Sequence, residues 1–267
     1  KYYEIISIGE LKEHIHSNLK EFKVVITFDD GYKDNKEIAL PILEKYSIPA
    51  TIYVVTRFLS GETSMWWYDL WSIVKARDII EFEFLKKTYI LPCDSMKNKL
   101  KSYYSLMQLF IKCDYSQQLI LLNKIREKIE LKDYSSLVLN KKDIFDLSKN
   151  KLITIGSHTH NHVSLKYLDS DNANIELEKS KKILENVTKD NISHFCYPYG
   201  TKNDFKKRDM KLVELNGYQT ATQTETFKIK NNLNFFGIPR FSVRNFDHRI
   251  IKSKINGLDN FIYTLIR

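Results

Sequence analysis

The chain has 267 residues, of which 43% are hydrophobic and 13% aromatic, and its formal net charge is +9. This composition can bury the core of one large domain, with or without a sizeable insertion, and it excludes a disordered chain. No apolar run approaches the roughly 20 residues that cross a bilayer, so we expect no transmembrane segment. Because the chain begins at Lys1 rather than Met, we expect an earlier segment to have been cut away, and both a cytoplasmic and a cell-envelope location stay open.

The positive charge comes from 42 Lys and Arg residues against 33 Asp and Glu residues. The lysines are scattered and form no compact basic block, so a nucleic-acid partner is not expected. A lysine-rich solvated surface explains the charge, and such a surface would also suit an anionic polymer such as an acidic glycan. The cysteines, Cys93, Cys113 and Cys196, lack Cys-x-x-Cys spacing, which predicts buried thiols rather than a disulfide framework or a zinc ribbon. Nothing in the composition indicates an oligomeric state.

The first βαβ unit begins near residue 23. Residues 23–28 predict a buried strand, residues 33–46 an amphipathic helix, and residues 50–55 a second strand. Pro41 within the helix is expected to kink it or to mark its true start. The residues expected on the apolar face of this helix are Ile38, Ile42, Leu43 and Tyr46.

Further strands and helices alternate after residue 150. The pattern predicts strands at 152–155, 194–197, 218–222 and 236–243, and helices at 171–187 and 204–215, the second of which is closed by Gly217. Repeated β-then-α units of this length predict a parallel sheet, either open or closed into a barrel.

Residues 60–139 interrupt this alternation. They include an aromatic cluster at 66–71, Trp-Trp-Tyr-Asp-Leu-Trp, and helical patterns at 95–113 and 117–131. Aromatic side chains dominate protein cores and binding surfaces alike, so the cluster predicts either helix packing or a sugar-stacking surface. We therefore expect residues 1–267 to form a single domain with a mostly helical insertion at about residues 60–139.

Two adjacent carboxylates follow the first predicted strand. The segment 27–32 reads Thr-Phe-Asp-Asp-Gly-Tyr, with Asp29 and Asp30 at the C-terminal end of the strand and Gly31 as the turn. Proteins with alternating strands and helices place their chemistry at this end of their strands. Two neighbouring carboxylates with separate roles, one binding a metal and one moving a proton, predict a hydrolytic site.

Three of the seven histidines lie within five residues, in the segment after the strand predicted at 152–155. His158 and His162 are four residues apart, a spacing that lets both imidazoles face one point in a helical turn or in a tight loop. His160 would point away in a helical arrangement, so we expect it to support the site rather than to bind the ion. Two histidines and one carboxylate leave positions open for water and substrate, as a catalytic metal requires.

Together with a third segment, these motifs resemble those of the polysaccharide deacetylases of the NodB-homology type, carbohydrate esterase family 4. The three motifs occur in order, as Thr-Phe-Asp-Asp-Gly-Tyr at 27–32, His-Thr-x-x-His at 158–162 and Phe-Cys-Tyr-Pro-Tyr-Gly at 195–200. Segments at 38–51, 165–184 and 238–243 are also similar, so the resemblance spans about residues 22–245 outside the insertion. It implies an α/β fold, a distorted (β/α) barrel with fewer than eight strands.

The resemblance also implies roles for the first two motifs. A divalent metal, zinc or else cobalt or nickel, would be held by Asp30, His158 and His162, and Asp29 would be the catalytic base. Such a metal polarises an amide carbonyl and lowers the pKa of a water molecule from about 15.7 towards 7.

In the third motif, the resemblance assigns the stabilisation of the reaction's oxyanion to the backbone N–H of Tyr199. Pro198 would stiffen the turn, and Gly200 would allow a close approach of the substrate. Pro198, Tyr199 and Gly200 are therefore the expected substrate-binding residues, with a plain turn as the alternative interpretation.

Two features depart from the commonest pattern of the family. Cys196 stands where many members carry an arginine, so the partner of Asp29 must come from elsewhere. Arg240, at the end of another predicted strand, is the candidate, with a surface ion pair as the alternative. The usual late Leu-x-His motif is also missing. His248 is the only histidine after residue 194, and it is either the general acid or an exposed loop residue; without it, Asp29 could return the proton to the leaving amine.

The resemblance implies a hydrolase that removes N-acetyl groups from amino sugars of a bacterial polysaccharide or glycan, such as a capsule, O-antigen or peptidoglycan component. Two alternatives stay open: hydrolysis of an ester or a non-sugar amide on the same fold, and a glycan-binding protein that has lost turnover. Retention of both Asp29 and Asp30 argues against the last, because a pure binder needs no base beside its ligand.

Overall fold

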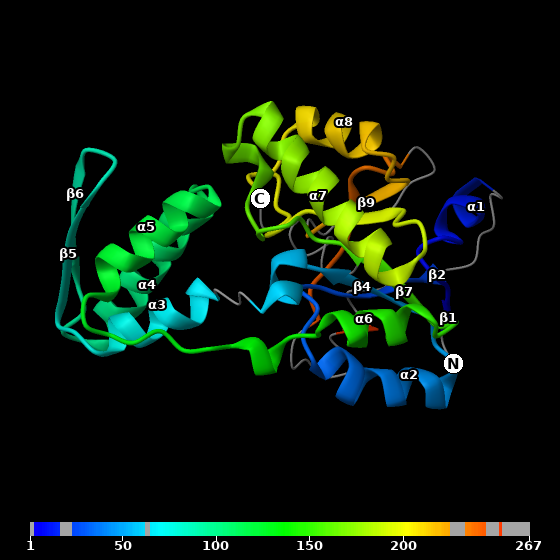
Figure 1. The fold of residues 1–267 in the computed structure, drawn as a ribbon, viewed down its shortest axis with the longest axis horizontal. Helices are drawn as coiled ribbons and strands as arrows, with labels where there is room; N and C mark the ends of the chain where they lie inside the picture. The colour runs from blue at the N-terminus through cyan, green and yellow to red at the C-terminus, as the bar shows by residue number, and fades with distance from the viewer. Residues whose placement is uncertain (1–2, 17–22, 62–64, 225–232, 244–250, 253–267) are drawn as a thin grey trace.

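The computed structural model describes residues 3–16, 23–61, 65–224, 233–243 and 251–252 (Figure 1). Within these residues, the centre of the fold is a six-stranded parallel sheet in the order β10-β9-β8-β7-β4-β3. The strands are β3 (Ile26–Phe28), β4 (Ala50–Val54), β7 (Ile153–Ser157), β8 (His194–Cys196), β9 (Thr220–Gln223) and β10 (Ile238–Pro239). All residues of β4, β8 and β9 are buried, as is usual where helices cover a parallel sheet.

The sheet curls, so that its two edge strands approach each other at their C-terminal ends. A flat sheet of this size would hold the edge strands about 24 Å apart, since neighbouring strands are about 4.8 Å apart. Arg240, which follows β10, nevertheless donates a 2.7 Å hydrogen bond to Oγ1 of Thr27 in β3. The fold is therefore the distorted (β/α) barrel that the family resemblance implies.

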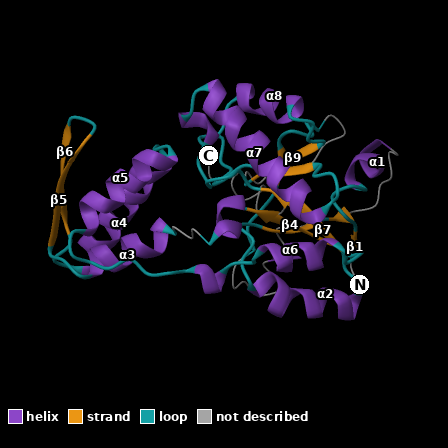
Figure 2. Cartoon of the chain, in the orientation of Figure 1, coloured by secondary structure: helices purple, strands orange, loops and turns teal. Residues whose placement is uncertain are grey.

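Helices cover the outside of the barrel. They are α2 (Leu40–Tyr46), α6 (Lys141–Ser148), α7 (Ser170–Thr188) and α8 (Lys207–Leu215). Figures 1 and 2 show α2 and α6 on one side of the strands and α7 and α8 on the other. The core between sheet and helices includes Ile52, Val54, Ile144, Leu177, Leu184, Phe195 and Val213. None of the helices in the described residues is both long enough and apolar enough to cross a membrane.

The N-terminal part of the chain adds a small parallel pair. β1 (Glu4–Ile5) pairs with β2 (Lys23–Val24), and α1 (Leu11–His16) lies between them in the sequence. The strand predicted at 23–28 is thus divided between this pair and β3. The strand predicted at 236–243 is shorter in the structure and is limited to β10, because only two of its residues pair with β9.

The apolar face predicted for the first helix is wrong. Ile38, Ile42 and Tyr46 are 64%, 53% and 53% exposed, whereas Leu43 is 6% exposed. The three exposed residues follow one another at intervals of four and lie together on the solvent side, whereas Leu43 and the partly buried Leu40 face the core. A π-helical segment, Asn35–Ala39, precedes α2. Pro41 lies in the first turn of α2. Of the two expectations for this residue, the one in which it marks the true start of the helix is confirmed.

The insertion has a hydrophobic cluster of its own. Its elements are α3 (Trp66–Lys75), β5 (Ile79–Phe84), β6 (Lys87–Pro92), α4 (Met96–Ile111) and α5 (Tyr115–Arg126). Within the cluster the ring of Trp66 stacks on that of Phe110, with 4.8 Å between centroids. The antiparallel hairpin of β5 and β6 is not predicted by the sequence analysis. Its two turn residues, Leu85 and Lys86, have φ values of +49° and +61°, a conformation that asparagine and glycine usually signal.

Both ends of the insertion attach to the loop that carries the two carboxylates. The N–H of Leu139 donates to the carbonyl of Gly31 at 3.0 Å, and the N–H of Lys33 donates to the carbonyl of Leu137 at 2.8 Å. At the other end, Met65 packs in one apolar cluster with Phe58 and Tyr134, and Tyr32 of the carboxylate loop packs against this cluster. The first turn of α3 is therefore held close to the carboxylates.

Candidate active site

The residues predicted for the site lie at the C-terminal ends of parallel strands. Asp29 and Asp30 follow β3, His158 follows β7, the turn of the third motif follows β8, and Arg240 follows β10. The ends of parallel strands share one edge of a sheet, and closure of the barrel turns that edge towards a common point. Residues from distant parts of the sequence thus meet.

Asp30, His158 and His162 form a compact set of metal-binding atoms. Oδ1 of Asp30 lies 3.4 Å from Nε2 of His158 and 3.3 Å from Nε2 of His162. Ligands at about 2.0–2.1 Å from a tetrahedral zinc lie about 3.3–3.4 Å apart, so these distances fit one small divalent ion. Among the described residues the buried Oδ1 of Asp30 has no hydrogen-bond donor, and a cation would satisfy it. The residues present therefore fit the metal that the sequence predicts.

Left-handed backbone conformations direct these ligands. The angle φ is +70° at Asp30, +66° at Thr159 and +55° at His162. Such conformations cost a non-glycine residue about 1–3 kcal/mol each and cluster at functional sites. The spacing of the two histidines therefore belongs to a tight loop, and the helical-turn alternative is wrong.

The environment of His158 leaves one ring nitrogen available to a metal. Nδ1 lies 2.8 Å from the carbonyl oxygen of Cys196, so the Nδ1–H donates to that oxygen. Nε2 is then the ring nitrogen that faces Asp30 and that a metal would use. Burial by itself would raise the pKa of Asp30, but the charge of the neighbouring imidazoles, His162 first, holds that pKa well below its usual range.

Asp29 is held by a two-pronged ion pair. Nη1 and Nη2 of Arg240 donate to its two carboxylate oxygens at 2.8 and 2.9 Å. Burial would raise the pKa of Asp29, but the charge and hydrogen bonds of Arg240 lower it below its ordinary value. Arg240 therefore has two effects on Asp29. It fixes the carboxylate plane, and it keeps the carboxylate unprotonated at neutral pH.

A second group of atoms with metal-binding chemistry, Asp29, His158 and Cys196, lies next to the first. Nη2 of Arg240 donates to Sγ of Cys196 at 2.8 Å as well as to Asp29. Two of its three members thus already bind a guanidinium ion, whose charge repels a divalent cation. Of the two groups, Asp30, His158 and His162 therefore fit a cation better.

The third motif forms a turn that faces the two histidines. The N–H of Gly200 donates to the carbonyl of Pro198 at 2.6 Å, and Tyr199 between them has a φ of +61°. Within the described residues no acceptor is recorded for the N–H of Tyr199, which makes it a candidate donor to a ligand. The Tyr199 hydroxyl donates to the carbonyl of His162 at 3.2 Å, so the turn also braces the metal-binding loop.

A family model for polysaccharide deacetylases matches residues 16–84 and 125–220 of this chain. The chain belongs to the polysaccharide deacetylase family. The stretch that the family model leaves out, between residues 84 and 125, contains β6, α4 and most of α5. The family match therefore includes both ends of the insertion but not its middle.

One relative and two solved structures illustrate what this chain is similar to. The Bacillus subtilis protein YxkH, whose name assigns it to the polysaccharide deacetylases, is 23% identical over 220 residues, which are 82% of this chain and 51% of YxkH. The chain thus spans about half the length of that relative. The Streptococcus pyogenes deacetylase PplD, in complex with acetate, is 16% identical with a TM-score of 0.61, over 95% of this chain and 80% of its own. The deacetylase domain of BpsB from Bordetella bronchiseptica is 14% identical with a TM-score of 0.59, over 90% and 78%. These structures share the fold.

Two other histidines, His160 and His248, are also candidates from the sequence. His160 is buried beside the metal-binding loop, and its Nδ1 lies 2.9 Å from Oγ1 of Thr56. Burial and the nearby charges of Lys179 and Arg57 lower the pKa of His160 to about 4, so it is neutral at neutral pH. His248, the candidate general acid in place of the late histidine of the deacetylase family, lies outside the described residues.

The structure adds an aromatic rim to the candidate site, formed by Tyr32, Trp67 and Tyr68. The ring of Trp67 lies against that of His162, with 5.2 Å between centroids. The hydroxyl of Tyr68 lies 3.5 Å from that of Tyr32, and Tyr68 is 42% exposed. The sequence alone leaves open whether the aromatic residues at 66–71 pack between helices or form a sugar-stacking surface. Trp66 packs in the insertion, whereas its neighbours Trp67 and Tyr68 turn towards the site.

Proposed function

We propose that this chain is a metal-dependent hydrolase that removes N-acetyl groups from amino sugars of a bacterial polysaccharide or glycan. The observation that carries the proposal is the oriented carboxylate of Asp29 beside the set of Asp30, His158 and His162. Membership of the polysaccharide deacetylase family supports the reaction class. A glycan of the bacterial cell envelope is the substrate class that we propose.

Asp30, His158 and His162 would hold the metal, with zinc as the best fit and cobalt or nickel as alternatives. When bound, such an ion supplies Lewis-acid activation of the amide carbonyl and of a water molecule. Three protein ligands leave further positions for water and substrate, as in catalytic zinc sites.

Asp29 would act as the general base. Its lowered pKa keeps the carboxylate ready to accept a proton at neutral pH. Both oxygens already accept hydrogen bonds from Arg240, so proton transfer uses the remaining lone pairs of a carboxylate whose plane is fixed.

Tyr199 would stabilise the negative oxygen that develops when the amide is attacked, through its backbone N–H. Pro198 and Gly200 hold that N–H in place by the tight turn described above. The departing amine needs a proton, and we propose His248 or Asp29 itself as the donor.

The aromatic rim favours a sugar over a small amide. Tyr68 and Trp67 offer flat apolar faces with polar edges, which suit the apolar face and the hydroxyl groups of a pyranose ring. The net charge of +9 is also compatible with an anionic glycan.

Acetate release from N-acetylglucosamine oligomers tests the proposal. We expect release by the zinc-loaded protein, and its loss both in a metal-stripped sample and in Asp29→Asn. Release from acetylated xylan alone would favour an ester hydrolase instead. Absence of acetate with any metal, alongside retained sugar binding, would favour a glycan-binding protein without turnover.

A further inference from the structure

We infer that Glu176, a buried residue of α7, is the positioning residue that holds the metal-binding loop in shape. This inference rests on the metal site proposed above. Glu176 is 7% exposed and belongs to a helix rather than to any of the three motifs. A buried carboxylate needs hydrogen-bond donors. Its donors come from the middle of the segment between His158 and His162.

The carboxylate of Glu176 receives three hydrogen bonds from two adjacent residues. Oε2 accepts the backbone N–H groups of His160 and Asn161 at 2.9 and 2.8 Å. Oε1 accepts a hydrogen bond from Nδ2 of Asn161. Hydrogen bonds to a charged acceptor are about twice as strong as neutral ones. One side chain therefore fixes the centre of the loop whose two ends carry the histidine ligands.

The loop needs such an anchor because its own backbone does not stabilise it. Thr159 and His162 adopt the left-handed conformation, and no helical ladder runs through residues 158–162. The loop is also tied by the N–H of Arg57, which donates to the carbonyl of His160 at 2.9 Å. The loop is thus clamped between residues 56–57 and α7, and Glu176 supplies the clamp from the helix.

The consequence is a preorganised pair of ligands. Without the three bonds of Glu176, the loop would relax from its left-handed conformations, and metal binding would have to restore them. Groups that orient metal ligands typically contribute 10-fold to 100-fold to metal affinity. Glu176 touches neither the substrate nor the metal in this account, so its effect should appear in metal affinity first.

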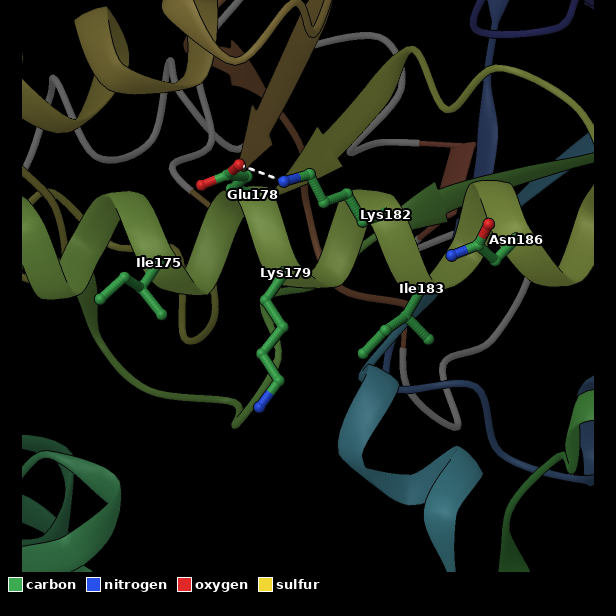
Figure 3. A pocket seen from close by; sticks show the side chains of 6 residues that line it. All are labelled: Ile175, Glu178, Lys179, Lys182, Ile183 and Asn186. Atoms are coloured by element: carbon green, nitrogen blue, oxygen red, sulfur yellow. Dashed lines mark hydrogen bonds and ion pairs between the residues drawn. The ribbon is translucent and has the colours of Figure 1, made fainter.

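The test compares Glu176→Gln with Glu178→Gln, which removes a carboxylate from the solvent side of the same helix. Glu178 pairs with Lys182 and lines a shallow hollow on the outer face of α7 that contains none of the site residues (Figure 3). Zinc affinity of the metal-free proteins is measured by competition with a chromophoric chelator. We expect 10-fold to 100-fold weaker binding for Glu176→Gln and binding within twofold of wild type for Glu178→Gln. With zinc at saturation, the Glu176 variant should regain most of its kcat at an unchanged KM.

Asn161→Ala is the second variant, in case Glu176→Gln does not fold. It removes the side-chain bond to Glu176, together with the bond that Nε of Arg57 donates to Oδ1 of Asn161, and it leaves the two backbone bonds to Glu176. A smaller loss of several-fold in zinc affinity is therefore expected. A variant whose melting temperature falls while its zinc affinity stays within twofold of wild type would overturn the inference, because Glu176 would then be only structural. If the wild-type protein itself binds no zinc, both this inference and the proposed function fail. If the wild type binds zinc tightly and the variants bind equally well, only this inference fails.

Discussion

Replacing Arg240 by methionine separates the charge of this residue from its bulk. Methionine keeps much of the apolar stem and removes the guanidinium ion that donates to Asp29 at 2.8 and 2.9 Å. The burial of Asp29 then acts without its main opposing charge, so the pKa of Asp29 should rise. The base is active when unprotonated. The acid limb of the pH profile of kcat/KM should therefore move to higher pH in Arg240→Met.

The expected magnitudes follow from the geometry of the pair. Removing one partner of a fully buried ion pair costs about 3–5 kcal/mol of unfolding free energy. The Asp29 side chain is 35% exposed, however, so solvent offsets part of this cost and we expect about 1–3 kcal/mol. Loss of the fixed carboxylate plane should lower kcat/KM at pH 7 by about 100-fold.

Arg240→Lys is the matched control for charge. Lysine keeps a positive charge but lacks the planar fork, so it should lower the rate while moving the acid limb less than methionine does. The assay is acetate release from an N-acetylglucosamine oligomer between pH 4 and 9. An acid limb that stays in place in Arg240→Met, with kcat/KM within threefold of wild type, would refute the proposed link between Arg240 and the base.

Three further predictions concern other parts of the chain. His194 is 7% exposed, and burial lowers its pKa from 6.5 to about 4. Between these pH values the unfolded chain takes up a proton at His194 and the folded protein does not. The contribution of this group to the free energy of unfolding is therefore fully present above pH 6.5 and is lost as the pH falls towards 4. Urea unfolding at pH 7 and 4.5 should show a loss of about 2 kcal/mol from this group, which His194→Asn should abolish, and an equal pH dependence in both proteins would contradict this. Gly200→Ala places a Cβ 3.0 Å from Thr224 at a φ of +67°, whereas the Cβ of Gly61→Ala meets nothing within 4 Å at a φ of +84°. In thermal unfolding we expect Gly200→Ala to lose about 2–4 kcal/mol of stability and Gly61→Ala about 1 kcal/mol. Equal losses would show that crowding at the Gly200 turn is unimportant. Tyr68→Ala should raise KM for a sugar oligomer about threefold to tenfold with kcat unchanged, and Tyr68→Phe should stay close to wild type; a fall in kcat without a change in KM would count against a stacking role.

The placement of the two carboxylates and the two histidines could be predicted because each group directly follows a strand. Parallel strands bring their C-terminal ends to one edge, so adjacency in sequence to a strand end is enough to predict proximity in space. The sequence suggests Arg240 as the partner of Asp29, but it does not distinguish this role from a surface ion pair. These residues are 211 positions apart and follow opposite edge strands, and only the curl of the sheet joins them.

Other features left too weak a signal in the sequence. The hairpin of β5 and β6 alternates buried and exposed residues along Ile79–Phe84, a strand pattern that could have revealed it, but its turn lacks asparagine and glycine. The first helix buries Leu43 and leaves Ile38, Ile42 and Tyr46 exposed, and the spacing of apolar residues does not tell these two sides apart. Glu176 escaped notice for a different reason. Its role depends on the direction in which a helix side chain points, towards a loop 15 and 16 residues earlier.

A zinc titration of matched variants tests the central claim, that Asp30, His158 and His162 hold one metal beside Asp29. Competition with a chromophoric chelator should give one tightly bound zinc per chain in the wild-type protein. Asp30→Ala and His162→Ala should abolish tight binding, whereas Asp29→Asn and Cys196→Ser should retain it, because their side chains bind Arg240 instead. Tight zinc binding that survives in Asp30→Ala and His162→Ala, or that disappears in Asp29→Asn, would contradict the account.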